Sequence, residues 1–335
     1  MKTRTVLLTE AQVQSLMDWK TAVRIAEELL REQANGSVLL PSEVHLSLHG
    51  CGLDSYLSAM PAYLDHLSLA GTKWGGGYGE NKKTGNLPYM MQVAILNSPI
   101  TGEIFAIMAS TWLTTTKTGS ETALSGKYLA LRDDLVVTVV GVGLQGRASV
   151  HCWLALDDLG DISVRELRIV NRHKAKAEEV ASAARHAHPG KSIRVIEDVQ
   201  EAVDGAHAVV TATTSTEPIV DRGWLRGDVL MAAIGSFPEF DPQAILDADK
   251  LVVDSWGPNM HLGSFSPLIE AGKITRDDIH GELPDIVAGK VAGRESSDGM
   301  IAASLTGLSS IDLAIAWEVY RRAVAEGVGT TFSFL

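Results

Sequence analysis

The sequence predicts an α/β protein in which a doubly wound parallel sheet is joined to a smaller α+β domain with a mostly antiparallel sheet. Three observations predict this class. A run of β-branched residues ends in a glycine pattern at 136–146 (VVTVVGVGLQG), and helical and strand patterns then alternate for about 120 residues. Before that run, residues 41–102 contain short apolar stretches separated by turn signals, which is typical of an antiparallel sheet.

The first part of the chain is predicted to begin with helices and continue as strands. Apolar residues recur at helical spacing across 9–33, and Asp18 is suited to cap the second of two helices there. Strands are expected at 44–48 (VHLSL), 56–60, 69–74 and 89–96, with turns at 83–85 and 98–102. Residues 114–131 are expected to form a helix that leads directly into the glycine-rich strand.

The second part of the chain alternates strands with helices. Further strands are expected at 166–170, 192–196, 207–211, 229–234 and 251–254, and helices at 145–156, 174–187 and 199–203. The chain closes with an amphipathic helix at 311–325, which we expect to pack back on the first part. The sequence therefore predicts a discontinuous first domain, residues 1–117 with 314–335, and a second domain of residues 118–313.

Gly141, Gly143 and Gly146 lie between an expected strand and an expected helix. The first glycine permits a tight turn, the second lets a pyrophosphate approach the main chain, and the third lets the helix pack on the strand. The N–H groups and dipole at the start of the helix also favour phosphate. The alternative is a glycine turn that serves packing alone. The pattern favours a Rossmann-type dinucleotide site over that alternative.

Ligands of such sheets bind at the carboxyl edge of the strands, where four loops are expected. The residues predicted to contact the dinucleotide in these loops are Gly141, Gly143, Leu144, Gln145, Gly146, Asn171, Arg172, Lys174, Thr211, Ala212, Thr213, Gly235 and Ser236.

The end of the second strand of the parallel sheet favours NADP(H) over NAD(H). A carboxylate at this place would bind the ribose 2′-hydroxyl and repel a 2′-phosphate, but residues 171–174 (NRHK) include no acid. Arg172 and Lys174 are suited to hold a phosphate. The alternative is an ordinary basic start to a solvated helix, with which NAD(H) use would be compatible.

Composition excludes several classes of function. The net charge of −12 argues against a nucleic-acid partner, and 45% hydrophobic with 21% charged residues is typical of a globular protein. No apolar run is long enough to cross a bilayer and no secretory signal is evident, so a cytoplasmic location is expected. Cys51 and Cys152 lack metal-ligand spacing, and no metal site is predicted.

Several motifs along nearly the whole chain give it a resemblance to the ornithine cyclodeaminase and mu-crystallin family. They are SAMPAYL (58–64), GTKWGGGYGEN (71–81), TKTGSETALSGKYLA (116–130), GVGLQGR, AAIGSFPEFD, GELPDIVAGKVAGRES and TGLSSIDLAIAWEVYRRA. The resemblance implies a homodimer formed through the first domain, which also binds substrate. It further implies a Rossmann domain for NAD(P)(H), and a substrate held between the two domains.

The same resemblance implies roles for individual residues. Lys73 matches the family's active-site lysine, which would bind a substrate carboxylate or move a proton; the alternative is a lysine at a strand edge. Lys117 stands where many relatives have arginine, and Ser58 stands where cyclodeaminases have glutamate. Glu43 replaces a basic residue of relatives, so it suits a substrate with a cationic or hydroxylated tail unless it is a surface glutamate.

Two further positions are left open by the resemblance. Asp312 would either contact the nicotinamide edge of the site or act as a helix N-cap. The loop after Gly235 is shorter than in cyclodeaminases, so their catalytic aspartate has no clear counterpart among Phe237, Glu239 and Asp241. This departure argues against cyclisation of ornithine.

We therefore expect an NAD(P)H-dependent oxidoreductase that acts on the C–N bond of an imino or amino acid or a related cyclic imine. Catalysis would depend on Lys73, with Glu43, Ser58 and Lys117 binding substrate. Two alternatives remain open. One is an ornithine- or lysine-type cyclodeaminase, an ammonia lyase that uses NAD catalytically. The other is a protein that binds NADPH and a small ligand in the manner of mu-crystallin.

Overall fold

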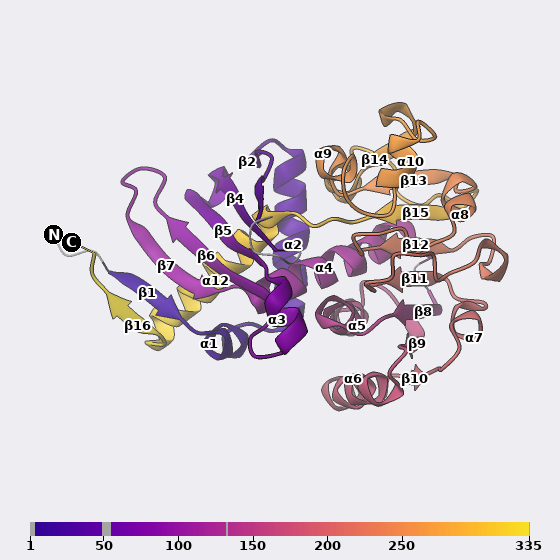
Figure 1. The fold of residues 1–335 in the computed structure, drawn as a ribbon, viewed down its shortest axis with the longest axis horizontal. Coiled ribbons are helices and arrows are strands. Elements are labelled where there is room, and N and C mark those ends of the chain that lie inside the picture. Colours follow the sequence, from indigo (N-terminus) through magenta and orange to yellow (C-terminus); the bar gives the residue numbers. More distant parts are fainter. Residues whose placement is uncertain (1–3, 49–54, 132, 335) are drawn as a thin grey trace. The chain divides into compact units, whose positions relative to one another are not determined.

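The computed structural model describes residues 4–48, 55–131 and 133–334, and the chain divides into two compact units (Figure 1). The first unit is Met1–Lys117 with Leu308–Leu335, and the second is Thr118–Gly307. The sequence predicts that the chain returns to the first unit at residue 314. In the structure the return precedes the C-terminal helix, so that this helix belongs entirely to the first unit.

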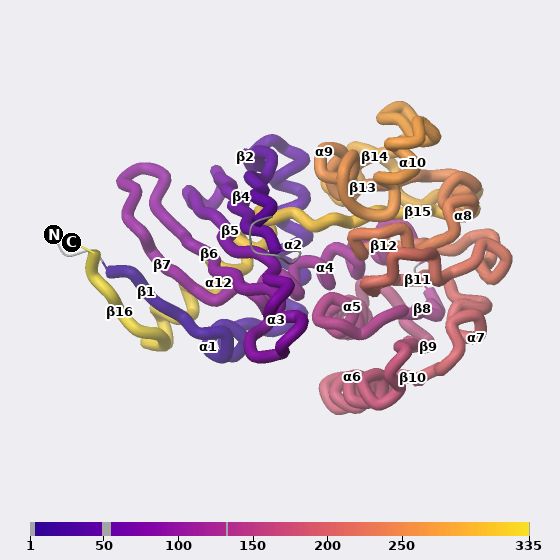
Figure 2. Tube along the Cα trace, viewed as in Figure 1, coloured from indigo at the N-terminus to yellow at the C-terminus, as the bar shows by residue number. Residues whose placement is uncertain are grey.

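One sheet organises the first unit. Its strands are β1 (Thr5–Leu8), β2 (Val38–Leu39), β3 (Val44–Ser47), β4 (Tyr56–Leu64), β5 (Leu69–Gly77), β6 (Met90–Asn97), β7 (Ile104–Ala109) and β16 (Thr330–Phe332). The order is β16-β1-β7-β6-β5-β4-β2, with β3 also paired to β4. Every pairing is antiparallel except that of β1 with β7, which confirms the predicted mostly antiparallel sheet. Figure 2 shows the C-terminal β16, in yellow, beside the N-terminal β1, in indigo.

Strand β4 continues through Pro61, whereas the strand predicted from the sequence ends at residue 60. Proline has no N–H and is tolerated only where a strand lacks a partner on one side. On the side away from β5, β3 pairs with residues 56–59 of β4 and β2 pairs with residues 63–64, so Pro61 falls between the two short partners. The strand can therefore include proline at this position.

The helices of the first unit are α1 (Glu10–Ser15), α2 (Trp19–Ala34), α3 (Gly79–Thr84) and α12 (Ser309–Glu326). Thr9 caps α1. The carboxylate of Asp18 accepts a hydrogen bond from the N–H of Thr21 at the start of α2, which confirms the predicted role of Asp18 as a cap. Helix α12 packs against α2 and against strands β4 to β7 (Figure 1). Helix α4 (Thr111–Leu129) begins in the first unit and ends in the second.

The second unit has the predicted doubly wound fold. Its strands are β8 (Leu135–Val140), β9 (Val164–Val170), β10 (Ile193–Val195), β11 (Ala208–Thr211), β12 (Leu230–Ala233), β13 (Lys250–Val253), β14 (Ile279–Glu282) and β15 (Ile301–Ser304). All pairings are parallel, in the order β10-β9-β8-β11-β12-β15-β13-β14. The helices are α5 (Leu144–Asp158), α6 (Lys174–Ala187), α7 (Val199–Val203), α8 (Pro242–Leu246), α9 (Trp256–Asn259), α10 (Ser266–Glu270) and α11 (Leu283–Val287).

Strand β8 illustrates why this sheet forms. All of its residues are buried, as expected for a strand that helices cover on both faces. The sheet order reverses direction between β8 and β11, and this is where the carboxyl edge of such a sheet binds ligands. Strands β14 and β15 were not predicted, because each is only four residues long and β15 (IAAS) is made of small residues.

No helix in the described part of the chain is long and apolar enough to cross a membrane.

Candidate functional site

The turn between β8 and α5 has the geometry that the glycine pattern predicts. Gly141 has a φ of +89°, which favours glycine, and a Cβ at this residue would lie 2.6 Å from the carbonyl oxygen of Ala212. A Cβ at Gly146 would lie 1.9 Å from the carbonyl oxygen of Gly141. A Cβ at Gly143, in contrast, would meet no atom within 4 Å. Packing therefore requires the first and third glycines, and Gly143 leaves open space at the turn.

The N-terminus of α5 is suited to an anion. The first N–H groups of an α-helix have no partner within the helix, and Gly143 at the N-cap provides no side-chain acceptor. Leu144 is exposed, and the buried Oε1 atom of Gln145 has no hydrogen-bond partner among the described residues. A pyrophosphate fits this donor set, because it would accept from the free N–H groups at the positive end of the helix dipole.

The end of β9 presents a polar loop with no carboxylate. The side-chain Oδ1 of Asn171 accepts from the N–H of Val142 at 3.3 Å, so Asn171 holds the glycine turn as well as facing the loop. Arg172 is exposed and has no ion pair among the residues that the structure describes. Lys174 is exposed and pairs with Glu197. Arg172 is therefore more readily available to a phosphate than Lys174, which would first have to break its ion pair with Glu197.

A buried carboxylate that sequence reasoning left unassigned holds the next two loops together. Glu239 is fully buried, and its oxygens accept from the N–H of Thr213 at 2.6 Å and from the N–H of Gly235 at 2.9 Å. Burial raises the pKa of Glu239, and the hydrogen bonds from these loops oppose the rise. Thr211 and Ala212 precede this link at the end of β11, and Ser236 follows it after β12.

The structure also gives roles to the other two candidates for a catalytic aspartate. Asp241 caps α8, where its Oδ1 accepts from the N–H of Gln243 at 2.9 Å. Phe237 is 45% exposed and carries no ionisable group. The carboxylates of this short loop are thus bound to main-chain N–H groups.

Lys73 lies on the covered face of the first unit's sheet. Along β5, Lys73 is buried while its neighbour Trp74 is 47% exposed, because successive side chains of a strand point to opposite faces. The covered face is the one against which α12 packs. The alternative of a lysine at a strand edge is therefore wrong, because β5 is an interior strand and the Lys73 side chain is 6% exposed.

Lys73, Lys117 and Asp312 form a buried cluster from three elements. The Nζ atom of Lys73 lies 3.3 Å and that of Lys117 lies 3.7 Å from the same oxygen, Oδ2 of Asp312. All three side chains are at most 6% exposed. Asp312 is in the first turn of α12, where the helix dipole favours a negative charge. The N-cap of α12 is Leu308, so the N-cap role considered for Asp312 is wrong.

A hydrogen-bond chain continues from this cluster to β6. The hydroxyl of Thr114 lies 2.9 Å from Oδ1 of Asp312 and 2.9 Å from the side-chain amide of Gln92. Both contacts run from the Thr114 hydroxyl to an acceptor oxygen, and because the hydroxyl has one proton, Oδ1 of Asp312 and Oε1 of Gln92 share it. Neither Gln92 nor Thr114 was predicted from the sequence as a site residue. The available signal was the spacing of Thr114 and Lys117, which puts them on one face of a helix.

The pKa of Lys73 reflects these surroundings. Burial lowers the pKa of its ammonium below the usual value, because a charged group is poorly solvated there. The charge of Asp312 opposes this effect, Lys117 adds to it, and Glu43 opposes it more weakly. Lys73 is therefore closer to losing its proton near neutral pH than an exposed lysine.

Ser58 shares the covered face with Lys73, and Glu43 lies close by. Ser58 is buried and pairs with Gly75, two residues after Lys73 on the same strand. Glu43 precedes β3, and its carboxylate lies 4.0 Å from His45, whose ring stacks on Tyr56 with centroids 4.9 Å apart. The Glu43 side chain is 42% exposed. Four residues that the sequence singled out, Glu43, Ser58, Lys73 and Lys117, thus belong to one unit.

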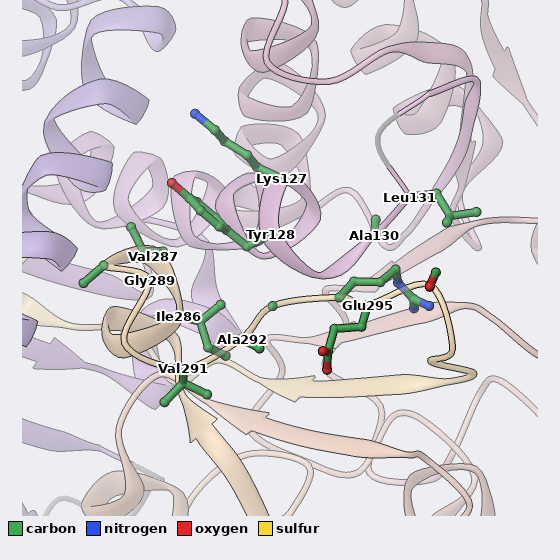
Figure 3. A pocket seen from close by; sticks show the side chains of 14 residues that line it. Lys127, Tyr128, Ala130, Leu131, Ile286, Val287, Gly289, Val291, Ala292 and Glu295 are labelled. Atoms are coloured by element: carbon green, nitrogen blue, oxygen red, sulfur yellow. The ribbon is translucent and has the colours of Figure 1, made fainter.

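A cavity also lies within the second unit. It measures about 570 Å³ and lies between the end of α4 and the segment around α11, with Lys127, Tyr128 and Val291 among its lining residues (Figure 3). It includes none of the predicted site residues, and Lys127 is paired with Asp161 at 2.9 Å. Over residues 4–48, 55–131 and 133–334, no group of histidine, cysteine or acidic residues is arranged to hold a metal ion.

Comparisons with known proteins agree with this geometry. A family model described as the ornithine cyclodeaminase/mu-crystallin family matches residues 3–327. Alanine dehydrogenase of Archaeoglobus fulgidus is 30% identical over 334 residues, which cover 98% of each chain. A delta(1)-pyrroline-2-carboxylate reductase of Bacillus cereus is 26% identical over 98% of this chain and 100% of its own.

Two solved structures of proteins with these activities are also similar to this chain. An archaeal alanine dehydrogenase dimer with bound NAD has a TM-score of 0.89 and 29% identity, covering 99% of this chain and 100% of that one. The delta(1)-pyrroline-2-carboxylate reductase of Thermococcus litoralis, in complex with NADH and L-proline, has a TM-score of 0.88 and 27% identity. That match covers 97% of this chain and 99% of that one.

Proposed function

This chain belongs to the ornithine cyclodeaminase/mu-crystallin family, and from that premise we propose that it is an NAD(P)(H)-dependent oxidoreductase acting on the C–N bond of an amino or imino acid or a related cyclic imine. The relatives that carry such names are an alanine dehydrogenase and pyrroline-2-carboxylate reductases. In this proposal the first unit binds the substrate and the second unit binds the dinucleotide.

The observation that carries the proposal is the buried ammonium of Lys73. An ammonium has three N–H donors, and within the described part of the chain its acceptor is the carboxylate of Asp312. A buried charge with donors left over is costly unless another acceptor is bound. A substrate carboxylate supplies the missing acceptor, and Lys117 adds a second cation 3.7 Å from the same Asp312 oxygen.

These residues suit the chemistry of C–N reduction. A bound nicotinamide supplies or takes up the hydride. Lys73 and Lys117 hold the acid group of the substrate and so fix the position of the neighbouring carbon. Lys73, with its lowered pKa, or a water molecule gives the proton that the nitrogen takes up on reduction, and the same group accepts it in the reverse reaction.

We propose NADP(H) in preference to NAD(H). Support comes from the absence of a carboxylate in the NRHK loop and from the exposed guanidinium of Arg172. The pairing of Lys174 with Glu197 limits that support, and two similar solved structures contain NAD or NADH. Affinities for NADPH and NADH, measured by fluorescence titration, decide between the two cofactors.

We also propose that the chain forms a homodimer through the first unit. The uncovered face of its sheet carries exposed apolar side chains, Val44, Leu46, Trp74 and Met91, and a shallow cavity of about 390 Å³ around Pro61 and Tyr63. Exposed apolar patches of this kind mark interfaces, and a similar archaeal structure is a dimer. Trp74→Glu should shift the protein toward monomer in sedimentation experiments.

Glu43 and Ser58 are proposed to contact the part of the substrate beyond the carboxylate. Glu43 is partly exposed, and its charge acts on Lys73. Glu43→Gln should raise KM for substrates with a cationic tail and leave KM for alanine-like substrates unchanged. Equal kinetics for both groups of substrates would remove Glu43 from the site.

The function is tested by a substrate screen that follows NADPH and NADH oxidation. Pyruvate with ammonia, pyruvate with methylamine and preformed cyclic imino acids represent the expected substrates. Turnover with net oxidation of NADPH or NADH supports the proposal. Release of ammonia from ornithine or lysine without net nicotinamide change would instead identify a cyclodeaminase. Dinucleotide binding without any turnover would identify a binding protein.

A further inference from the structure

Asp312 has a place in the site that its position in the sequence does not suggest. It lies in the first turn of α12, is fully buried, and uses its two oxygens for different partners. Oδ1 accepts from the hydroxyl of Thr114, and Oδ2 faces the ammonium groups of Lys73 and Lys117. One carboxylate therefore links α12, α4 and β5 at the point where the substrate carboxylate is proposed to bind.

We propose that Asp312 is a positioning residue that keeps Lys73 protonated and fixes the direction of its ammonium for the substrate carboxylate. This inference deepens the proposed function and rests on it. Because Asp312 accepts one Lys73 proton from the α12 side, the remaining donors of the ammonium are directed away from α12. Asp312 itself does not need to touch substrate or dinucleotide in this role.

The hydrogen-bond chain explains why Oδ2 is available to the lysines. The hydroxyl of Thr114 lies 2.9 Å from Oδ1 of Asp312 and 2.9 Å from Oε1 of Gln92 on β6, and it donates its proton to these acceptors, so Oδ1 faces α4. The carboxylate plane is thereby held by a neighbour on each side. Without Thr114, the carboxylate could rotate and share both oxygens between the lysines, so that the ammonium direction would no longer be fixed.

Electrostatics supports the same role. The charged groups that act on Lys73 are Asp312 from α12, Lys117 from α4 and Glu43 from the segment before β3. Asp312 opposes the lowering of the Lys73 pKa by burial, and Lys117 adds to that lowering. Loss of the Asp312 charge should therefore let Lys73 lose its proton at a lower pH, and loss of the Lys117 charge should have the opposite effect.

Asp312→Asn removes the negative charge of the side chain and keeps its shape. The asparagine oxygen can face the lysines while its amide N–H donates to Thr114, and Thr114 can then donate to the Gln92 side chain. The contacts of Thr114 with residue 312 and with Oε1 of Gln92 are both kept, and only the charge is lost. Thr114→Val is the complementary change, because it keeps the charge and removes the bond that holds the carboxylate plane.

The test measures binding of propionate, as a probe for a substrate carboxylate, to the dinucleotide-loaded protein by calorimetry between pH 6 and 10. In wild type, affinity should fall as Lys73 loses its proton. In Asp312→Asn this fall should move to lower pH, with affinity at pH 8 reduced about tenfold or more, the scale of one buried charge contact. In Thr114→Val the fall should stay where it is in wild type, while propionate should bind more weakly at every pH because the ammonium direction is no longer fixed.

A matched control and a second variant keep the test decisive. Glu318→Gln removes a carboxylate from the same helix, where it pairs with Arg321 and Arg322 at 3.0 Å, and should leave the profile unchanged. If Asp312→Asn does not fold, Lys117→Met replaces it, and its profile should move to higher pH although its affinity is weaker. A profile that stays in place in the variant that folds would overturn the proposal. Because propionate binding needs no turnover, this result is independent of whether the substrate screen finds a reaction.

Discussion

The glycine turn of the second unit and the lysine cluster of the first are both suited to anions, but they are built in opposite ways. The turn uses main-chain N–H groups and open space within residues 141–146, one short stretch of chain. The cluster uses charged side chains on β5, α4 and α12, and Lys73 and Asp312 are 239 positions apart. A site of N–H groups keeps its charge at any pH, whereas a buried ammonium depends on its neighbours. This difference predicts which substitutions disrupt binding at each of the two sites.

The largest expected effect is that of Lys73→Met, which keeps the length of the side chain and removes the charge. It should lower kcat/KM by about 100-fold or more, because a charged partner of the substrate is lost. Steady-state kinetics measures the loss, and dinucleotide affinity should not change. If turnover in Lys73→Met equalled that of wild type, the cluster would have no part in the reaction.

Substitution of single glycines tests the turn and separates folding from binding. Gly146→Ala places a Cβ against the main chain of Gly141, and such overpacking should lower the free energy of unfolding by about 1–3 kcal/mol. Gly143→Ala adds a Cβ in open space, so stability should be kept while dinucleotide affinity falls. Thermal unfolding and fluorescence titration measure the two effects. Undiminished affinity in Gly143→Ala would place the pyrophosphate elsewhere.

Arg172→Ala tests whether the dinucleotide is bound by a side chain as well as by main-chain N–H donors. The change should weaken NADPH binding about tenfold and leave NADH binding unchanged, because only the 2′-phosphate would contact the guanidinium. Lys174→Ala is the matched comparison. It should have the smaller effect, since Lys174 already pairs with Glu197. Equal loss of NADPH and NADH affinity would contradict the proposed NADP(H) preference.

The smallest expected effect is that of Glu239→Gln, which replaces a buried carboxylate between two loops. The change should cost about 1 kcal/mol of unfolding free energy near pH 4, because one main-chain N–H loses its acceptor. Because burial raises the Glu239 pKa, protonation favours the folded state. The stability that Glu239 contributes is complete below its unfolded pKa and is lost as pH rises through its folded pKa. The difference between wild type and Glu239→Gln, measured by denaturant unfolding, should therefore shrink as pH rises.

Several parts of the fold could be read from local patterns. The helices capped by Thr9 and Asp18, the interior strand β8 and the alternation after it were all predictable, because capping, burial on two faces and 3.6-residue spacing are properties of short stretches. The strands β1, β7, β14, β15 and β16 were not predicted. Each has at most six residues, and sheet pairing with strands distant in sequence stabilises them.

Some residues of the candidate site were likewise predictable from the sequence, and others were not. The glycine turn, Lys73 and Lys117 were named from the sequence, and the turn has the predicted geometry. The pairing of Glu239 with Thr213 and Gly235 was not predictable, since it depends on how loops from two strands meet. Gln92 and Thr114 were missed for the same reason.

By itself, the sequence determined the two kinds of sheet, the glycine turn and the lysines that a carboxylate substrate would need. Only the tertiary structure decided that Asp312 lies between those lysines and that Thr114 and Gln92 hold its carboxylate. The physical reason is the separation along the chain of the residues that set each property. Turn geometry and helix capping are set by neighbouring residues, whereas the charge state of a buried group is set by whichever distant side chains packing brings within a few ångströms.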